Sequence, residues 1–478
     1  MIELSGEPWA NDHMERKGIA NFLTSYLDGD TRVKVLNINA PWGTGKTFFL
    51  RNWSQQEFRQ GRACIYFNAW EADYSGDAFV SLVSTIRDQL EDIIGFQSDA
   101  EHVLKDFTKK ASKTLVAATP ALAKGILKKF TGIELSIIAD IIDNDQLGDA
   151  AEKAVEELIK SNKETLATVK DFKHVLNKLL RQAAEKCATG GSVKVAYIYI
   201  DELDRCRPTF AIELLERIKH LFDVDSCRFI IATDTSQLGE AVRAVYGNGF
   251  DSGKYLRRFF DREYSLSNID FTSWIKAKCI HFERDNMVSL GLRKRYTRLG
   301  RPSHAYNLPN SMPHPDTELA ADIEITESQL VILSLANTFK PSLRDLDKII
   351  CHLEAVQSGL SNQPFHFFWA AYLVFLKIEA PDIYSTSFSG SYAGAIADLM
   401  DRYPARYLYF GSVSRSVHAI FETYIGLYRN GRNNAQETAR RSTDEELQYV
   451  TTAIMEFANE FERMKLYPTF VNLAYSME

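Results

Sequence analysis

The sequence predicts an α/β fold with a five-stranded, mainly parallel sheet, a long helical insertion between the second and third strands, and a helical C-terminal region. Three observations support this prediction. A short apolar segment runs into a glycine-rich loop at Ala40–Thr47 and then into a helix. Another apolar segment, Val193–Ile200, ends at two adjacent carboxylates. Helical periodicity fills most of the stretch from Glu71 to Ala188, which lies between them.

The loop Ala40–Thr47 reads A-P-W-G-T-G-K-T, with Ala40 where the pattern G-x-x-x-x-G-K-[ST] has its first glycine. Glycines at positions 43 and 45 let the backbone curl so that its N–H groups converge on phosphate oxygens. Lys46 would then reach the β- and γ-phosphates, and the hydroxyl of Thr47 would ligate Mg²⁺. These residue types predict a phosphate-binding loop.

The segments on both sides of the loop give it the expected context. Val33–Asn39 is rich in β-branched and apolar residues, as a short buried strand is. Phe49 and Trp53 lie four residues apart on the helix that follows, whose positive N-terminal end would face the phosphates. Strand, loop and helix in this order favour a nucleoside triphosphate site over a chance glycine turn.

A second strand is predicted at Ala63–Asn68, and it ends in the string F-N-A-W. The side chain of Asn68 either orients groups at the site or caps the local backbone, and the cap is the commoner role of such a residue. Residues 71–188 then form the helical insertion. Its helix Ala78–Ile94 has apolar residues on one face, as a helix packed on a core requires.

The third strand, Val193–Ile200, runs straight into Asp201 and Glu202. Asp201 would hold hydrated Mg²⁺ at the carboxyl end of the strand, where ligands gather in an open parallel sheet. Glu202 would be placed to polarise the attacking water. On its own the string also fits an edge strand with a polar turn, but downstream of a phosphate-binding loop we expect the catalytic pair.

The fourth strand is predicted at Arg228–Ala232, and the fifth at Glu263–Leu266. The fourth strand ends at Thr233 and Asp234, a position that suits a polar contact to the γ-phosphate or to the water. Before the fifth strand lies a cluster of arginines: Arg257, Arg258 and Arg262. An arginine of this cluster would complete the site of a neighbouring subunit, or the cluster forms surface salt bridges.

We therefore expect residues 1–70 and 189–270 to form the nucleotide-binding core, with the insertion at 71–188. A lid-like helical region follows at 271–355, with a loop rich in proline and arginine at 293–315, and a helical C-terminal domain at 356–478. The loop is either a solvated insertion or a contact to a nucleic-acid backbone. The apolar run Phe365–Leu376 is 12 residues long by its bounds, too short for a membrane span, so it predicts a buried helix.

Composition places the chain among ordinary globular proteins, with 45% hydrophobic and 25% charged residues among 478. The net charge of −7 excludes a surface that is basic overall, so nucleic acid would need a local patch. The six cysteines form no C-x-x-C pair, which suits reduced thiols in the cytoplasm and gives no zinc signature. The first residues lack the apolar core of a signal peptide.

The chain resembles the KAP family of P-loop NTPases, in the additional-strand class. Three strings carry the resemblance: P-W-G-T-G-K-T at Pro41–Thr47, F-N-A-W at Phe67–Trp70, and I-D-E-L-D-R-C at Ile200–Cys206. It covers about Asp12–Ile350 and implies a helical insertion between strands two and three. Many relatives carry paired transmembrane helices in that insertion. The insertion of this chain has no apolar run that would span a bilayer, so we expect no membrane span.

The resemblance also implies roles for particular residues. Arg344 stands where a helical lid in related ATPases places a nucleotide-sensing arginine, and Glu202 stands where relatives often have aspartate. Related ATPases also present an arginine before the fifth strand towards the adjacent subunit, which makes Arg258 and Arg262 candidates. With the roles inferred from the residues, the expected catalytic residues are Lys46, Glu202, Arg258 and Arg262. The expected nucleotide contacts are Pro41, Trp42, Gly43, Thr44, Gly45, Lys46, Thr47, Phe48, Asp201, Thr233, Asp234 and Arg344, with Thr47 and Asp201 as Mg²⁺ ligands.

These observations predict a Mg²⁺-dependent ATPase that acts as an oligomerising switch. Bacterial members of the family are often associated with defence against phage, which suggests such a role by analogy, together with a separate effector protein. Two alternatives stay open. One is a DNA-engaging motor that uses the loop at 293–315, which DNA-stimulated hydrolysis would reveal. The other is a nucleotide-binding scaffold with little turnover, which the intact pair Asp201 and Glu202 speaks against.

Overall fold

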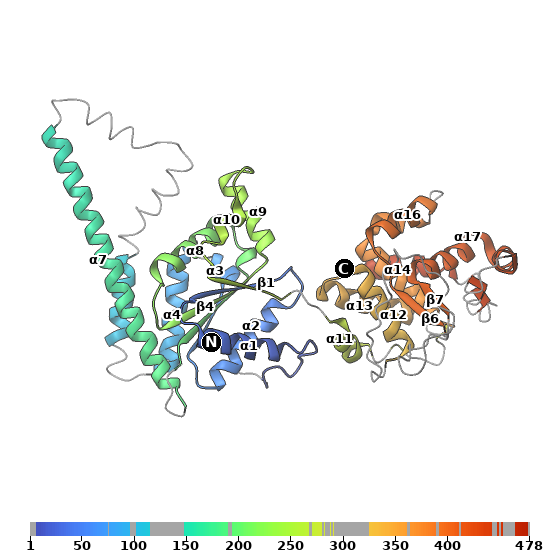
Figure 1. The fold of residues 1–478 in the computed structure, drawn as a ribbon, viewed down its shortest axis with the longest axis horizontal. Coiled ribbons are helices and arrows are strands. Elements are labelled where there is room, and N and C mark those ends of the chain that lie inside the picture. Colours follow the sequence, from blue (N-terminus) through green and yellow to red (C-terminus); the bar gives the residue numbers. More distant parts are fainter. Residues whose placement is uncertain are drawn as a thin grey trace. The chain divides into compact units, whose positions relative to one another are not determined.

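The structure is a computed structural model. It describes residues 6–74, 76–95, 102–114, 148–189, 194–266, 270–279, 282, 287, 290, 325–360, 364–388, 392–410, 413–441, 447–448, 451–452 and 464–476. The chain divides into two compact units, Met1–Asn268 and Ile269–Glu478 (Figure 1). The first unit contains the phosphate-binding loop.

The first unit is built on a five-stranded sheet with the order β2-β3-β4-β1-β5. All of its paired strands run parallel, so the expected mainly parallel sheet is wholly parallel. The strands are β1 (Val35–Asn39), β2 (Cys64–Asn68), β3 (Ala196–Asp201), β4 (Cys227–Thr233) and β5 (Arg262–Ser265). The strand β4 lies between β1, which precedes the phosphate-binding loop, and β3, which ends at the carboxylate pair. The carboxyl ends of β1, β3 and β4 therefore meet at one edge of the sheet.

Helices cover both faces of this sheet because successive side chains of each strand point to opposite faces. On one face α1 (Arg16–Gly29) and α2 (Lys46–Arg59) bury Leu36, Ile38 and Tyr199. On the other face α4 (Ala78–Ile94), α7 (Gly148–Cys187) and α8 (Pro208–Leu221) bury the alternate set, which includes Ile198 and Ile200. Most residues of β1 to β4 are buried, as the continuous apolar runs of the sequence predicted, whereas β5 at the edge of the sheet is largely exposed.

Trp53 of α2 anchors the first of these faces, since its side chain is fully buried. Its ring lies 5.5 Å from Phe49 and 5.6 Å from Tyr199, and its Nε1 donates to Thr24 Oγ1 at 2.9 Å. We expect Trp53→Ala to lower the free energy of unfolding by about 3–5 kcal/mol, because a large cavity would remain. Denaturant unfolding measures this loss. Trp70→Ala, at a half-exposed tryptophan, is the control and should change stability by less than about 0.5 kcal/mol.

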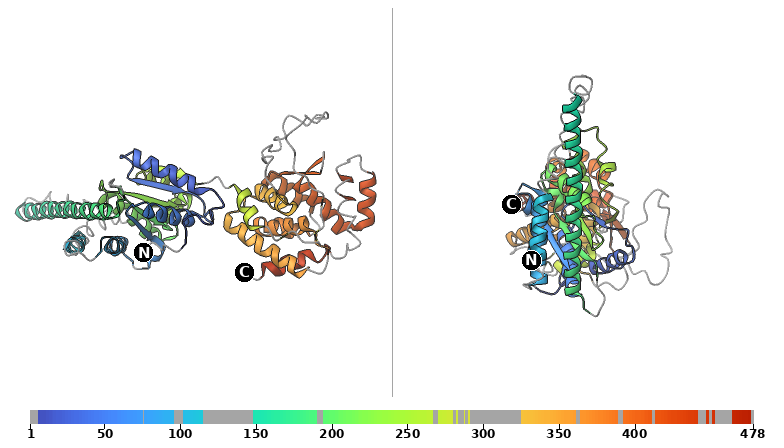
Figure 2. Two further views of the ribbon diagram at one scale, coloured as in Figure 1. Left: turned by 90° about the horizontal axis from the view of Figure 1, so that it is seen from below. Right: turned by 90° about the vertical axis from the view of Figure 1, so that its left-hand side faces the viewer.

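The expected insertion is helical where the structure describes it. It contains α3 (Ala69–Asp73), α4, a helix at residues 102–114, and α7, which is 40 residues long. The second half of α7 packs on α4, where Phe172 lies between Phe79 and Phe107 (Figures 1 and 2). The insertion thus supplies α4 and α7, which share one face of the sheet with α8.

The second unit is a group of helices around α14 (Phe367–Glu379), whose residues Phe367 to Leu376 are all buried. This confirms the buried helix that the apolar run predicted. Helix α13 (Leu343–Gly359) spans the boundary expected at 355 and packs on α14 and on α20 (Tyr467–Tyr475). The lid-like region and the C-terminal region therefore lie in one compact unit.

The remaining elements of this unit are α11 (Phe271–Lys278), α12 (Glu327–Phe339), α15 (Pro381–Ser387), α16 (Tyr392–Arg402), α17 (Val417–Arg441), and an antiparallel hairpin of β6 (Tyr407–Phe410) and β7 (Val413–Ser416). The sequence did not predict this hairpin, because strands of four residues are too short for a clear period of two. Among the described residues, no helix is long and apolar enough to cross a membrane.

Candidate nucleotide-binding site

The glycine-rich loop joins the end of β1 to the start of α2. Gly43 and Gly45 have φ values of 78° and 85°, in the left-handed region that glycine adopts at little cost. Ala40 is not among the described residues with positive φ, which explains why alanine is tolerated where the motif usually has glycine. The backbone N–H of Ala40 donates to Thr233 O at 3.0 Å, so the loop starts beside the end of β4.

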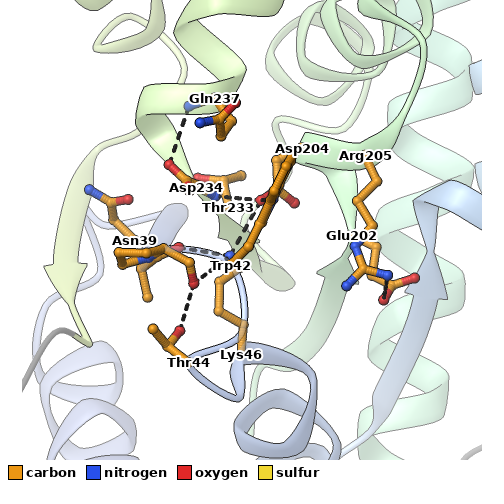
Figure 3. Close-up of polar contacts among 12 residues, drawn as sticks. Asn39, Trp42, Thr44, Lys46, Glu202, Asp204, Arg205, Thr233, Asp234 and Gln237 are labelled. Carbon is orange, nitrogen blue, oxygen red and sulfur yellow. Dashed lines mark hydrogen bonds and ion pairs between the residues drawn. The ribbon is translucent and has the colours of Figure 1, made fainter. Parts of the chain in front are cut away.

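Lys46, the first residue of α2, folds back over the loop. Its Nζ donates to Ala40 O at 2.7 Å and to Pro41 O at 3.3 Å. The same ammonium lies 3.3 Å from Asp204 Oδ2, and the two side chains are 9% and 1% exposed. Figure 3 shows Lys46 beneath Asp204 and Trp42. The lysine ammonium therefore lies over the loop, beside the backbone that would hold a phosphate chain.

Asp204 is the functional residue that sequence reasoning missed. It lies in the short helix η1 (Leu203–Arg205) directly after β3. Its Oδ2 accepts a hydrogen bond from Trp42 Nε1 at 2.7 Å and another from the backbone N–H of Asp234 at 2.8 Å. Asp204 thus joins the carboxylate strand to the phosphate-binding loop and to the end of β4 (Figure 3). The sequence signal was a third carboxylate in D-E-L-D-R, three residues beyond Asp201.

Asp201 is buried at the end of β3, as expected of a metal-binding carboxylate at this edge. Its Oδ2 accepts from the hydroxyl of Tyr66 at 2.6 Å, and its Oδ1 accepts from Glu202 N at 2.9 Å. Burial raises the pKa of Tyr66, and the Asp201 carboxylate raises it further, so this hydroxyl stays a donor. Tyr66, from the adjacent strand β2, was not predicted as part of the site.

The donor set fits Mg²⁺. Within the described part of the chain, no group of three or more His, Cys, Asp or Glu residues forms a complete metal site. A hydroxyl from Thr47 and a carboxylate from Asp201 are hard oxygen ligands, and Mg²⁺ usually takes its remaining ligands from phosphates and water. The chain therefore offers the partial oxygen site of a Mg²⁺–nucleotide complex.

We expect Tyr66→Phe to weaken the apparent affinity for Mg²⁺ by about tenfold, because loss of a hydrogen bond to a metal ligand loosens that ligand. Nucleotide binding measured across a Mg²⁺ titration tests this. Tyr74→Phe, at an exposed tyrosine, is the matched control. Equal Mg²⁺ dependence in wild type and Tyr66→Phe would remove Tyr66 from the site.

Glu202 has an unusual backbone conformation, with φ 60° and ψ 25°. A non-glycine residue in this region is strained, and such strain gathers at functional sites. Its carboxylate pairs with Arg205 Nη1 at 2.8 Å and is 14% exposed. Figure 3 shows this pair to one side of the group formed by Lys46, Trp42 and Asp204. The expected base is thus near the edge of the site, held by an arginine.

The string F-N-A-W forms the end of β2 and the start of α3. Asn68 Oδ1 accepts from the backbone N–H groups of Trp70 and Glu71, so the asparagine caps α3. This confirms the capping role over the orienting one. The guanidinium of Arg205 lies 5.6 Å from the centre of the exposed ring of Trp70. The string therefore supports the segment that carries Glu202 and Arg205.

At the end of β4, the side chains of Thr233 and Asp234 form hydrogen bonds within the protein. The hydroxyl of Thr233 donates to Asn37 Oδ1 at 2.8 Å, inside the sheet. The carboxylate of Asp234 accepts from the N–H groups of Ser236 and Gln237, and so caps α9 (Thr235–Tyr246). Both side chains are engaged in the fold, and the backbone N–H of Asp234 is the group directed at Asp204.

Arg16, at the start of α1, is a third residue that the sequence did not reveal, after Asp204 and Tyr66. It is 3% exposed, and its Nη1 donates to Gly45 O at 3.1 Å. Burial lowers the pKa of Arg16, while the nearby Asp12 opposes this shift. A buried guanidinium beside the loop fixes the carbonyl of Gly45, which also accepts from Phe49 N at the start of α2.

The expected arginines belong to different parts of the chain. Arg258 and Arg262 are exposed, and Arg262 follows Asp261, whose backbone N–H donates to Val35 O at the start of β1. Arg262 donates to Tyr26 Oη at 3.0 Å and to Asp261 O at 2.9 Å. Arg344 is exposed on α13, in the second unit. The loop at 293–315 lies outside the described residues.

Comparison with known proteins gives one finding that agrees with this geometry. The model of the KAP family P-loop domain matches residues 16–357. No curated protein matches the chain.

Proposed function

Because the chain belongs to the KAP family of P-loop NTPases, we propose that it is a Mg²⁺-dependent ATPase that acts as an oligomerising switch. The observation that carries the proposal is the edge of the sheet where Lys46 pairs with Asp204, Asp204 accepts from the backbone N–H of Asp234 after β4, and Asp201 ends the neighbouring strand β3. An ammonium, a buried carboxylate and a curled backbone at one edge are what a triphosphate and its metal require.

Each group has a part in the reaction. The backbone N–H groups of the loop hold the phosphate oxygens, and the Lys46 ammonium balances charge on the β- and γ-phosphates. Mg²⁺, when bound, would neutralise charge on the phosphate oxygens beside Thr47 and Asp201. Glu202 would accept the proton of the attacking water after its carboxylate leaves Arg205.

We expect Glu202→Gln to bind Mg²⁺-ATP like wild type and to hydrolyse it more slowly by a factor of roughly 10²–10⁴, because an amide cannot accept the proton. Steady-state phosphate release, with binding measured separately, tests this. Glu240→Gln removes an exposed carboxylate that pairs with Arg243, and it should hydrolyse normally. A parallel loss of binding in Glu202→Gln would assign Glu202 to metal binding or to structure instead.

Oligomerisation is the part of the proposal that concerns Arg258 and Arg262. Arg262 pairs with Leu36 near the start of β1, and Arg258 precedes it by four residues, whereas the phosphate-binding loop follows the end of β1 at Asn39. An exposed arginine at this distance from its own loop suits the site of a neighbouring subunit. Arg258 is the better candidate, because the guanidinium of Arg262 already donates to Tyr26 and to the backbone of Asp261.

The proposal also includes a role in anti-phage defence in the cytoplasm, with a separate effector protein, by analogy with the family. The test is to purify the chain together with the products of its native neighbouring genes. A stable complex whose assembly changes with ATP supports the switch. Absence of any ATP-dependent partner, combined with unchanged phage sensitivity in cells that carry Lys46→Ala, would contradict it.

A further inference from the structure

One carboxylate oxygen, Asp204 Oδ2, is surrounded by nitrogen donors from three parts of the first unit. Trp42 Nε1 lies at 2.7 Å, Asp234 N at 2.8 Å and Lys46 Nζ at 3.3 Å. Trp42 and Lys46 belong to the phosphate-binding loop and the start of α2, and Asp234 follows β4 (Figure 3). Three donors that converge on one point make an anion-binding position.

This position lies where the end of a triphosphate would be expected. The strand β4 is between β1 and β3, so the end of β4 separates the phosphate-binding loop from the carboxylates that follow β3. A phosphate oxygen resembles a carboxylate oxygen in charge and in hydrogen-bond geometry, and a P-loop lysine serves the β- and γ-phosphates. The Asp204 oxygen therefore has the environment expected for an oxygen of the terminal phosphate.

We infer that Lys46 Nζ, Trp42 Nε1 and Asp234 N form the binding site for a γ-phosphate oxygen, and that Asp204 fills it as an internal anion which a nucleoside triphosphate must displace. This inference rests on the proposed ATPase function. The carboxylate lowers the affinity for the triphosphate, because ligand binding must break its contacts with all three donors.

Displacement of Asp204 would also change the position of the expected catalytic base, Glu202. Asp204 lies in η1, between Glu202, which precedes this three-residue helix, and Arg205, which ends it. A shift of η1 would therefore move both partners of the Glu202–Arg205 ion pair. Binding of the γ-phosphate would thus shift the segment that contains the expected base. A diphosphate, which lacks this group, would leave the segment in place.

The test compares ATP and ADP affinities of wild type and Asp204→Asn by isothermal titration. The amide keeps an acceptor for Trp42 and Asp234 but cannot hold Lys46 as an ion pair. We expect Asp204→Asn to bind ATP about tenfold more tightly, with a smaller gain for ADP, because a charged hydrogen-bond partner is removed from the unliganded state. Asp223→Asn is the control, since it removes one charge from a half-exposed pair with Lys34.

Asp204→Ser provides a second variant if the amide does not fold, and the same increase in the ATP-to-ADP affinity ratio is expected. An unchanged or lower ratio in the folded variant would overturn the inference. So would normal ATP affinity with a collapse of turnover, since Asp204 would then act on the attacking water without leaving its place. If wild type binds no nucleotide, the proposed function itself fails, which is a different result.

Discussion

Lys46→Ala is expected to bind ATP at least about a hundredfold more weakly than wild type and to show no measurable hydrolysis, because charge-assisted contacts to two phosphates are lost. The structure also indicates that this substitution leaves the fold intact. The lysine contacts two loop carbonyls and Asp204, and its side chain contributes little to the apolar core. The variant should therefore remain folded by circular dichroism.

Lys46→Ala has two effects: it removes a contact to the ligand, and it leaves the buried Asp204 carboxylate without its ion-pair partner. The double variant Lys46→Ala/Asp204→Asn distinguishes these effects. Removal of Lys46 alone leaves Asp204 with two neutral donors, which costs some stability. The double variant should recover that stability without recovering ATP binding. Lys34→Ala removes a lysine paired with Asp223 and Asp225, and it should bind ATP normally. Normal hydrolysis by purified Lys46→Ala would show that the loop is not the phosphate site.

Arg258→Ala is expected to retain ATP binding while hydrolysis falls by about 10³–10⁵, the range for an arginine supplied in trans to a transition state. Since an isolated subunit would lack this group, wild-type hydrolysis should rise more than linearly with protein concentration. A mixture of Arg258→Ala and Lys46→Ala should regain activity, because one subunit offers an intact loop and the other an intact arginine.

Arg257→Ala is the matched control for this experiment, since Arg257 is the exposed neighbour of Arg258. It should affect turnover by much less. Arg262→Ala tests the second candidate, and a large effect there would reverse our preference. If neither Arg258→Ala nor Arg262→Ala alters turnover, or if the active species is a strict monomer, the trans arginine is excluded.

The strands and the loop were predictable because their signals are local. The apolar segments at Val33–Asn39 and Arg228–Ala232 mark β1 and β4 to within two residues at each end. Glycine at 43 and 45 gave the loop its curl, and both residues have positive φ. Parallel strands buried on both faces read as continuous apolar runs, so their number and order of appearance followed from the sequence.

The contacts that make the site were not predictable in this way. Asp204 and Trp42 are 162 residues apart, and Tyr66 and Asp201 are 135 apart. Only the sheet order brings such pairs together. The direction in which a side chain points is also not predictable from the sequence. Their position at the end of the fourth strand suggested that Thr233 and Asp234 contact the ligand, whereas in the structure Thr233 donates to Asn37 and Asp234 caps α9.

We propose that the site at Ala40–Thr47 hydrolyses ATP with Mg²⁺. Steady-state phosphate release by the purified full chain tests it most directly, measured over a range of protein concentrations with Lys46→Ala as the blank. We expect saturable release that requires Mg²⁺ and stops when EDTA is added. Release no faster than that of Lys46→Ala at every protein concentration, or release unaffected by EDTA, would contradict it.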